Sequence, residues 1–336
     1  MGLKFAQIGI GNWGKNIFRN FYNLNEVDML AVSDLDDGIL KGLKANYPGV
    51  ETTQNAQLIL NNPAIDAVVI ATVPETHFEF ARQALENNKH VFVEKPMTLK
   101  SQTGEILVEL AEKNRLKLMV GHILEYHPAY LKVKAYLDSG ELGEVRYLYS
   151  TRVNLGVVRK KENALWSLAP HDISIALMLL GKNPSRVVCT GQSYLQPGIE
   201  DVAFAMVHFP NGKMAQLHVS WLDPHKIRKL TVVGSKKMVV LDDMESTEKI
   251  RLYDKGVDLK EDFTGYQEAL TLRVGDIHIP KLTMQEPLKL ECQHFVDSIL
   301  NDTPPRSDGF DGLQVVKILE AADKSLKNHG EPVEIL

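Results

Sequence analysis

This chain of 336 residues has few cysteines, no long apolar run and no large net charge. Its two cysteines, Cys189 and Cys292, form neither a disulfide framework nor a metal-binding spacing, which favours a reducing compartment. No stretch approaches the roughly 20 apolar residues that a membrane-spanning helix needs, and the N-terminus shows no signal-peptide pattern. We therefore expect a cytoplasmic protein without a membrane partner.

The charge balance is mildly acidic. Lys and Arg total 38 against 43 Asp and Glu, giving a net charge of −5, which argues against nucleic acid as the main partner. The hydrophobic content of 44% and the charged content of 24% are typical of a globular protein. At this length we expect two domains.

The first part of the chain alternates short apolar strands with helices. This pattern is typical of a doubly wound parallel sheet, so residues 1–122 are predicted to form a Rossmann domain. The expected strands cover residues 5–10, 27–32, 67–71, 90–93 and 117–120.

The pattern of predicted elements changes after His122, where turns rather than crossover helices join the strands. Residues 123–336 are therefore predicted to form an α+β domain with a large open, mainly antiparallel sheet. Helices should cover one face, while the other face could pair with a second subunit in a homodimer or homotetramer. The C-terminal helix is a candidate to pack back on the first domain. The expected strands are 145–153, 186–190, 203–209, 214–221, 229–233 and 238–241, with helices over 128–138, 169–180 and 312–328.

Three glycines follow the first predicted strand in the pattern G-x-G-x-x-G. Gly9 permits a tight turn, Gly11 lets the backbone approach a pyrophosphate, and Gly14 allows close packing of helix and strand. Asn12 and Trp13 lie inside this loop. The alternative is an ordinary glycine-containing turn, but the strand–loop–helix context favours a dinucleotide site.

Asp34 ends the second predicted strand, twenty residues after Gly14. A carboxylate at this position can accept hydrogen bonds from ribose hydroxyl groups and would repel a 2′-phosphate, so the expected cofactor is NAD rather than NADP. The alternative is a helix-capping role, because Asp36 and Asp37 follow closely.

Polar side chains also follow the third and fourth strands, where an open parallel sheet binds its ligands. Thr72, Pro74 and His77 come after the third strand, and Glu94 and Lys95 end the fourth. A lysine there can polarise a carbonyl or transfer a proton. The alternatives are a locally hydrogen-bonded histidine for His77 and a surface salt bridge for Lys95.

The second domain carries a further candidate acid/base. His171 lies in a Pro-His-Asp run, and a histidine there could take a proton from a substrate hydroxyl near neutral pH. The alternative for His171 and Asp172 is a helix N-terminus. A basic cluster comes just before them and suggests an anionic substrate group, such as a phosphate, or else a solvated loop. The cluster consists of Arg152, Asn154, Arg159, Lys160, Lys161 and Asn163.

With these motifs in view, the chain resembles the glucose–fructose oxidoreductase / inositol dehydrogenase / rhizopine catabolism (Gfo/Idh/MocA) family over essentially its whole length. The matching segments are Gly9–Gly14, Thr72–His77, Glu94-Lys95-Pro96, 141–145 and the helix at 315–325. The resemblance implies an NAD(P)-binding Rossmann domain, a substrate domain with an open sheet, and Lys95 and His171 as catalytic residues. Many relatives have an aspartate at the position of Ser167, so proton transfer here would rest on Lys95 and His171, with Asp172 assisting.

Within this family, the segments 121–128 and 152–172 are similar to the nucleotide-sugar 3-dehydrogenases, and they add His122 and Trp166 to the substrate-binding candidates. This similarity implies oxidation of the C3 hydroxyl of UDP-N-acetylglucosamine or its uronate, with the neutral sugar favoured and no metal required. The 3-keto product would pass to an aminotransferase that makes a 3-amino sugar for a surface glycan or lipid A. The alternatives are a dehydrogenase of a free sugar or inositol and a non-catalytic NAD-sensing regulator.

Overall fold

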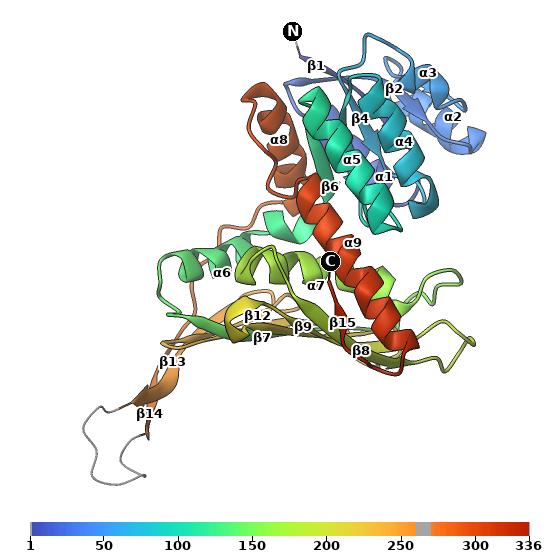
Figure 1. Cartoon of the computed structure of the whole chain (residues 1–336). Helices are drawn as coiled ribbons and strands as arrows, with labels where there is room; N and C mark the ends of the chain where they lie inside the picture. The colour runs from blue at the N-terminus through green and yellow to red at the C-terminus, as the bar shows by residue number, and fades with distance from the viewer. Residues whose placement is uncertain (1, 260–269, 336) are drawn as a thin grey trace. The chain divides into compact units, whose positions relative to one another are not determined.

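The computed structural model describes residues 2–259 and 270–335, and the chain divides into two compact units. The first unit contains residues 1–126 and 285–317, and the second contains residues 127–284 and 318–336. The long helix α9 (Gly309–Lys327) begins in the first unit and ends in the second (Figure 1).

The first unit is built on a six-stranded parallel sheet in the order β3-β2-β1-β4-β5-β6. The expected Rossmann sheet is confirmed. Its strands are β1 (Leu3–Ile8), β2 (Val27–Ser33), β3 (Glu51–Thr53), β4 (Ala67–Ile70), β5 (His90–Glu94) and β6 (Leu118–Gly121). Its helices are α1 (Gly14–Tyr22), α2 (Asp37–Asn46), α3 (Gln57–Leu60), α4 (Pro74–Glu86), α5 (Ser101–Asn114), η1 (Ile123–Tyr126), α8 (Pro287–Leu300) and the start of α9.

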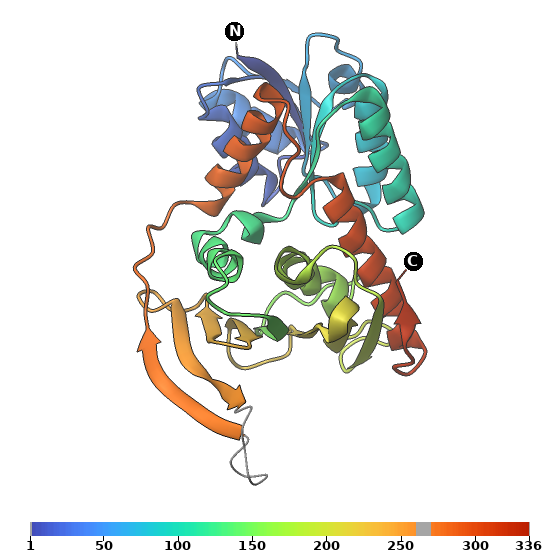
Figure 2. The same cartoon turned by 60° about the vertical axis from the view of Figure 1, so that its left-hand side comes forward.

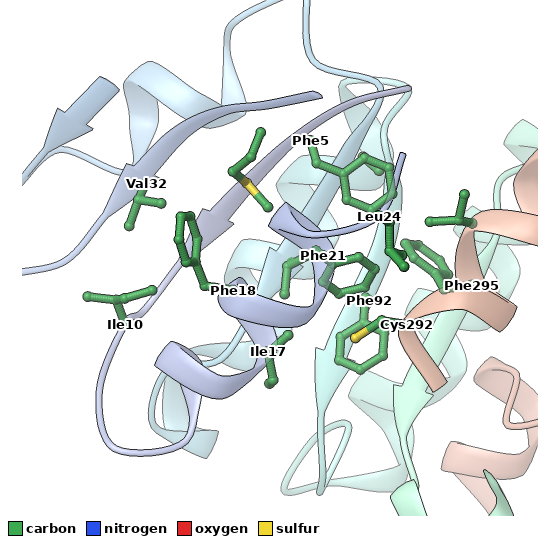
Figure 3. Packing of buried hydrophobic residues seen from close by; sticks show 14 of the residues in the cluster. Phe5, Ile10, Ile17, Phe18, Phe21, Leu24, Val32, Phe92, Cys292 and Phe295 are labelled. Atoms are coloured by element: carbon green, nitrogen blue, oxygen red, sulfur yellow. The ribbon is translucent and has the colours of Figure 1, made fainter. Parts of the chain in front are cut away.

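Both faces of this sheet are covered, because its strands are apolar on both sides. Helices α4 and α5 pack on one face, and α1 and α8 pack on the other. The second face holds an aromatic cluster in which the rings of Phe21 and Phe92 lie 5.5 Å apart, and those of Phe92 and Phe295 lie 5.8 Å apart (Figure 3). Residues of α8 are therefore part of the Rossmann core although they lie far along the chain.

The strand order reverses beside β1, which has β2 on one side and β4 on the other. Ligands of open α/β sheets bind outside the carboxyl ends of the strands at such a switch point. The glycine loop, Asp34, Thr72 and Lys95 all follow the carboxyl ends of these strands.

The second unit contains a nine-stranded sheet in the order β14-β13-β12-β11-β7-β10-β9-β8-β15. Among its described strand pairs, β7 and β10 run parallel and the others antiparallel, which confirms the expected mainly antiparallel sheet. Its strands are β7 (Val145–Val153), β8 (Arg186–Gln192), β9 (Val202–His208), β10 (Met214–Ser220), β11 (Ile227–Gly234), β12 (Met238–Asp242), β13 (Ile250–Leu259), β14 (Leu270–His278) and β15 (Val333–Glu334). Its helical elements are α6 (Pro128–Asp138), α7 (Ala164–Leu180), η2 (Pro210–Gly212) and the end of α9.

The two faces of this sheet differ. Helices α6 and α7 lie on one face (Figure 2), and alternate residues of β9, such as Ala203 and Ala205, are buried there. On the opposite face Tyr149 is 39% exposed and Phe204 is 46% exposed. Strands β13 and β14 form a hairpin that extends away from the rest of the sheet.

Helix α7 begins five residues earlier than the helix predicted from Ala169, and the prediction was wrong because Pro170 was taken for a helix start. Asn163 is the N-cap, and its side-chain oxygen accepts a hydrogen bond from the backbone N–H of Trp166 at 3.1 Å. Pro170 lies inside the helix, where its missing N–H removes one backbone hydrogen bond. His171 is therefore an interior helix residue.

Within residues 2–259 and 270–335, no helix has the length and apolar character needed to cross a membrane.

Candidate functional site

The glycine loop has little room at two of its three glycines. A Cβ atom on Gly9 would lie 2.6 Å from the carbonyl oxygen of Ala71, and one on Gly14 would lie 2.5 Å from the carbonyl oxygen of Gly9. Gly9 also has a φ of +91°, which side chains rarely tolerate. A Cβ atom on Gly11, by contrast, would meet nothing within 4 Å. Two glycines thus permit the fold of the loop, while the third leaves open space beside the backbone.

The side chain of Gln7 on β1 stabilises this loop through two hydrogen bonds. Its side-chain amide donates to the carbonyl oxygens of Gly9 at 2.7 Å and Gly14 at 2.8 Å. Gln7 was not predicted as a site residue, although a polar residue within the mainly apolar strand β1 is a local signal for such a role.

Asp34 lies at the carboxyl end of β2 and is tied to the glycine loop. It accepts a hydrogen bond from the backbone N–H of Ile10 at 2.7 Å, and another from the N–H of Asp36 at 3.0 Å. Asp36, not Asp34, caps α2 by accepting from Gly38 and Ile39. The carboxylate of Asp34 is partly exposed and has further lone pairs available for ribose hydroxyl groups.

These features fit an NAD molecule. The N-cap of α1 is Trp13, which makes no side-chain capping bond, and the neighbouring Asn12 is exposed. The open space at Gly11 and the positive end of α1 suit a pyrophosphate, while Asp34 suits the adenine ribose.

The segment after β4 is organised by a buried histidine. His77 is 1% exposed, and its Nδ1 and Nε2 atoms face the carbonyl oxygens of Pro96 at 2.9 Å and Thr72 at 3.2 Å. Burial lowers the pKa of His77. Pro74 begins α4. His77 therefore ties the loop after β4 to the segment that carries Lys95.

Glu94 ends β5 and Lys95 follows it, and the peptide bond between Lys95 and Pro96 is cis. The carboxylate of Glu94 accepts the indole N–H of Trp13 at 2.7 Å and the backbone N–H of Lys95 at 3.2 Å. Burial raises the pKa of Glu94 to about 7, although Lys95 and the two donors oppose this shift. A Cβ atom on Gly121 would lie 2.8 Å from Glu94, so this glycine is needed to make room for the carboxylate.

His122 follows β6 and is fully buried. Both of its ring nitrogens lack a hydrogen-bond partner within the described part of the chain. Burial, reinforced by the charge of Lys95, lowers the pKa of His122 to about 3. This imidazole is therefore neutral at physiological pH.

In the second unit, His171 lies one helical turn after Ser167, on the same side of α7. Both side chains are partly exposed, as is Trp166. The backbone carbonyl of His171 accepts the hydroxyl of Ser174 at 3.1 Å.

Arg152 and Asp172 form a buried ion pair between β7 and α7. The Nε atom of Arg152 lies 2.6 Å from one oxygen of Asp172, and a second guanidinium nitrogen lies 3.2 Å from the other. Ser150 also donates to Asp172 at 2.6 Å. Burial opposes the charge of Arg152, but attraction to Asp172 outweighs it and raises the arginine pKa. These groups hold the helix that carries His171 against the sheet.

The remaining candidates divide between internal and exposed positions. Asn163 is buried and donates to Glu200 at 2.8 Å. Asn154 is partly exposed, whereas Arg159 is exposed and lies 3.4 Å from Glu162. Lys160 and Lys161 are exposed as well. The basic cluster of the sequence is thus two sets: Arg152 and Asn163 support the fold, and residues 159–161 face the solvent.

Sequence reasoning missed Ser150 and Gly121, because the residues that they contact, Asp172 and Glu94, lie more than twenty residues away in the chain. Over the described ranges, no group of three or more His, Cys, Asp or Glu side chains is arranged to hold a metal ion.

Two family models match most of the chain. The model described as an oxidoreductase family with an NAD-binding Rossmann fold matches residues 3–122, and the GFO/IDH/MocA C-terminal domain matches residues 130–240. The expected NAD cofactor is confirmed by the first match.

The names of the curated relatives mention different substrates. The chain is 27% identical to scyllo-inositol 2-dehydrogenase (NAD(+)) of Bacillus subtilis, over 99% of this chain and 96% of that protein. It is 26% identical to UDP-N-acetylglucosamine 3-dehydrogenase of Acidithiobacillus ferrooxidans, over 75% and 76% of the two chains. The solved structure of the Acidithiobacillus enzyme superposes with a TM-score of 0.82 at 22% identity, covering 98% of this chain and 99% of the other, which supports the same fold.

Proposed function

The chain belongs to the Gfo/Idh/MocA oxidoreductase family and is an NAD-dependent dehydrogenase, and from this premise we propose that it oxidises the C3 hydroxyl of UDP-N-acetylglucosamine. The observation that carries this choice is the exposed run Arg159-Lys160-Lys161, which leads directly into the helix of His171. Exposed cations just before the helix that carries the candidate acid/base suit a substrate with a diphosphate group, and Arg159 would exchange its ion pair with Glu162 for it. The named relative that acts on UDP-N-acetylglucosamine supports the same choice.

In this proposal the residues of the chain have separate roles. Bound NAD supplies the hydride acceptor. His171 takes the proton of the C3 hydroxyl, and Lys95 donates a hydrogen bond to the same oxygen as it becomes a carbonyl. Asp172 does not relay this proton because Arg152 and Ser150 hold both of its oxygens. Asp172 instead fixes the helix of His171.

The proposed catalytic roles can be tested by substitution. Lys95→Ala and His171→Ala should each lower kcat by about 100-fold or more, since a positioned acid/base contributes about that much. NAD affinity, measured by fluorescence titration, should stay within a few-fold of wild type. Near-normal turnover in both variants would contradict the assignment.

The diphosphate contact can be tested separately. The double variant Arg159→Ala, Lys160→Ala should raise the KM for UDP-N-acetylglucosamine about tenfold or more, because hydrogen bonds to charged groups contribute about 1.5–3 kcal/mol. Lys226→Ala is a matched control, since Lys226 is an exposed lysine elsewhere in the same unit. Equal KM values in the double variant and the control would refute a role for the basic run.

A second candidate is the oxidation of an inositol. Two observations favour it: the inositol dehydrogenase of Bacillus subtilis aligns with almost the whole chain, and Arg152 is held internally by Asp172 rather than left for a phosphate. If inositol is the substrate, turnover should not depend on a nucleotide group.

We further propose that a second copy of the chain covers the open face of the nine-stranded sheet. Five large, mainly apolar side chains on three adjacent strands face outward, with Gln216 and His218 of β10 between them: Tyr147, Tyr149, Phe204, Met206 and Met214. Phe204→Glu should reduce the mass measured by light scattering, whereas Leu58→Glu, at an exposed leucine of α3, should not. A monomeric wild type would contradict the proposal.

The proposed 3-keto sugar product would pass to an aminotransferase.

A further inference from the structure

Two loops of the second unit contact each other beside the basic run. The first loop, residues 154–162, contains the basic run and leads into α7, and the second loop, residues 193–200, lies between β8 and β9. The side-chain amide of Gln196 donates a hydrogen bond to the carbonyl oxygen of Arg159 at 2.9 Å. The backbone carbonyl of Glu200 accepts the N–H of the first residue of α7 at 2.8 Å. The second loop is therefore joined both to the basic run and to the start of the helix that carries the candidate acid/base.

A buried pair, Asp201 and Trp221, anchors both loops. Asp201 is fully buried, and its carboxylate accepts the indole N–H of Trp221 at 2.5 Å. The same carboxylate accepts the backbone N–H groups of Tyr194 at 2.7 Å and Leu195 at 2.9 Å. The carbonyl oxygen of Trp221 accepts the backbone N–H of Gly156 in the first loop at 3.3 Å. Contacts within the second unit thus set the position of the two loops relative to each other.

Large apolar side chains are exposed on both loops. Leu155 and Val157 are exposed on the first loop, and Tyr194 and Leu195 are exposed on the second, where Tyr194 is 70% exposed. Exposed apolar side chains that gather in one place commonly mark a binding surface. Here they adjoin exposed cations. A ligand that has both an anionic group and a flat apolar ring matches this combination better than a simple anion or a polyol does.

The position of the loops along α7 suits a nucleotide-linked sugar. His171 lies seven residues after the first residue of α7, which corresponds to roughly 10 Å along the helix axis. A diphosphate linked to a sugar can span this distance. If the sugar lies at His171, its diphosphate reaches the start of the helix, and the nucleoside beyond it reaches the two loops.

We propose that Tyr194 stacks on the base of a nucleoside diphosphate whose phosphates bind the basic run of the first loop. Tyr194 would thereby favour a nucleotide-linked sugar over a free sugar or an inositol. Stacking on an aromatic ring suits this role because every nucleobase has a flat π-face. The identity of the sugar rests on the proposed function, but the binding of a nucleoside diphosphate can be measured without turnover.

The first test is the binding of UDP, measured by calorimetry on protein saturated with NAD so that UDP does not occupy the dinucleotide site. Tyr194→Ala should raise the Kd for UDP about tenfold, whereas Tyr194→Phe, which keeps the ring, should stay within about twofold of wild type. Met244→Ala is the control, because Met244 is an exposed apolar residue of the same unit outside both loops. The same Kd in wild type and Tyr194→Ala, or no binding of UDP to wild type, would overturn the proposal.

Inorganic pyrophosphate separates the base from the phosphates. Tyr194→Ala should bind pyrophosphate as wild type does, because pyrophosphate has no ring to stack. The double variant Arg159→Ala, Lys160→Ala should bind it about tenfold more weakly. If Tyr194→Ala weakened the binding of pyrophosphate as much as that of UDP, the substitution would act through the position of the loops, and stacking would be refuted.

Turnover distinguishes this proposal from the proposed function. With UDP-N-acetylglucosamine, Tyr194→Ala should raise KM about tenfold with a smaller change in kcat, because a contact remote from the reacting atoms binds substrate and transition state alike. Oxidation of this sugar with the same KM in wild type and Tyr194→Ala would contradict the role of Tyr194 and leave the proposed function standing. Binding of UDP that depends on Tyr194, in a protein that does not oxidise UDP-N-acetylglucosamine, would support the role of Tyr194 and contradict the proposed function.

A second copy of the chain is the alternative cover for these loops. A lower mass of Tyr194→Ala by light scattering, together with an unchanged affinity for UDP, would identify the loops as a subunit contact and overturn the proposal.

Discussion

Replacing Glu94 with glutamine should stabilise the protein relative to wild type, and this difference in the free energy of unfolding should grow as the pH rises. The amide has nearly the shape of the carboxylate and can still accept the indole N–H of Trp13, but it cannot ionise. Burial raises the pKa of Glu94 from 4.5 to about 7, so its proton is bound more tightly in the folded chain than in the unfolded chain. Below about pH 4.5 Glu94 is protonated in both the folded and the unfolded chain, and the free energy of unfolding has its full value. The contribution of Glu94 declines as the pH rises and is lost by about pH 7.

The size of the effect follows from the same shift. A difference of one pH unit corresponds to about 1.4 kcal/mol, so a rise from 4.5 to about 7 corresponds to roughly 3 kcal/mol in the free energy of unfolding. The gap between Glu94→Gln and wild type should therefore widen by about 3 kcal/mol between mildly acidic and mildly alkaline pH. Burial raises the pKa of Glu291, and the charge of Glu94 raises it further. Removal of that charge in Glu94→Gln reduces the shift, which further widens the stability gap at high pH.

Urea unfolding followed by circular dichroism at about pH 5 and about pH 8 measures this gap, with m-values compared to show that the same transition is observed. Glu286→Gln is the control, because Glu286 is about half exposed and paired with Arg19. A pH dependence that is the same in wild type and Glu94→Gln would refute the reasoning.

Three further substitutions test other parts of the structure. Gly9→Ala should abolish NAD binding and destabilise the protein by more than about 1 kcal/mol, because its Cβ would lie 2.6 Å from the Ala71 carbonyl oxygen; wild-type affinity by calorimetry would contradict this. Asp34→Ala should weaken NAD binding and reduce the preference for NAD over NADP, since the carboxylate that repels a 2′-phosphate is removed; an unchanged ratio of the two dissociation constants would count against the assignment. Asp172→Asn should lower the free energy of unfolding by about 3–5 kcal/mol, because Arg152 is left buried without its counter-charge; a loss under about 1 kcal/mol by urea titration would refute the buried pair.

The parts of the fold that repeat a local pattern could be predicted from the sequence. The central strands β4 and β5 of the first unit are runs of mainly buried apolar residues, and helix 128–138 and strand 145–153 have the bounds that were expected, whereas the short polar strand β3 was not predicted. Strands β13 and β14 were not predicted, because polar and charged residues interrupt their apolar positions and their hairpin extends from the sheet.

The candidate site could be predicted only in part. The glycine loop and the Glu94-Lys95 pair have local signatures, since strand, loop and helix follow one another in the chain. Arg152 has no such signature, because its partner Asp172 lies twenty residues later on a helix whose start was obscured by Pro170.

Glu291 shows the same limit more strongly. In the sequence it stands between Leu290 and Cys292 in an ordinary amphipathic helix, and nothing local marks it as fully buried. Its environment comes from the packing of α8 on the Rossmann sheet, which joins residues that are far apart in the chain.

The most direct test of the central claim is the rate of NADH formation with UDP-N-acetylglucosamine, free N-acetylglucosamine and scyllo-inositol, each with NAD and with hydrazine to trap the ketone. Our account predicts NADH with the UDP-sugar and at least tenfold less with the two compounds that lack a nucleotide, because the exposed basic run then has no diphosphate to bind. Equal or faster turnover of scyllo-inositol would contradict it.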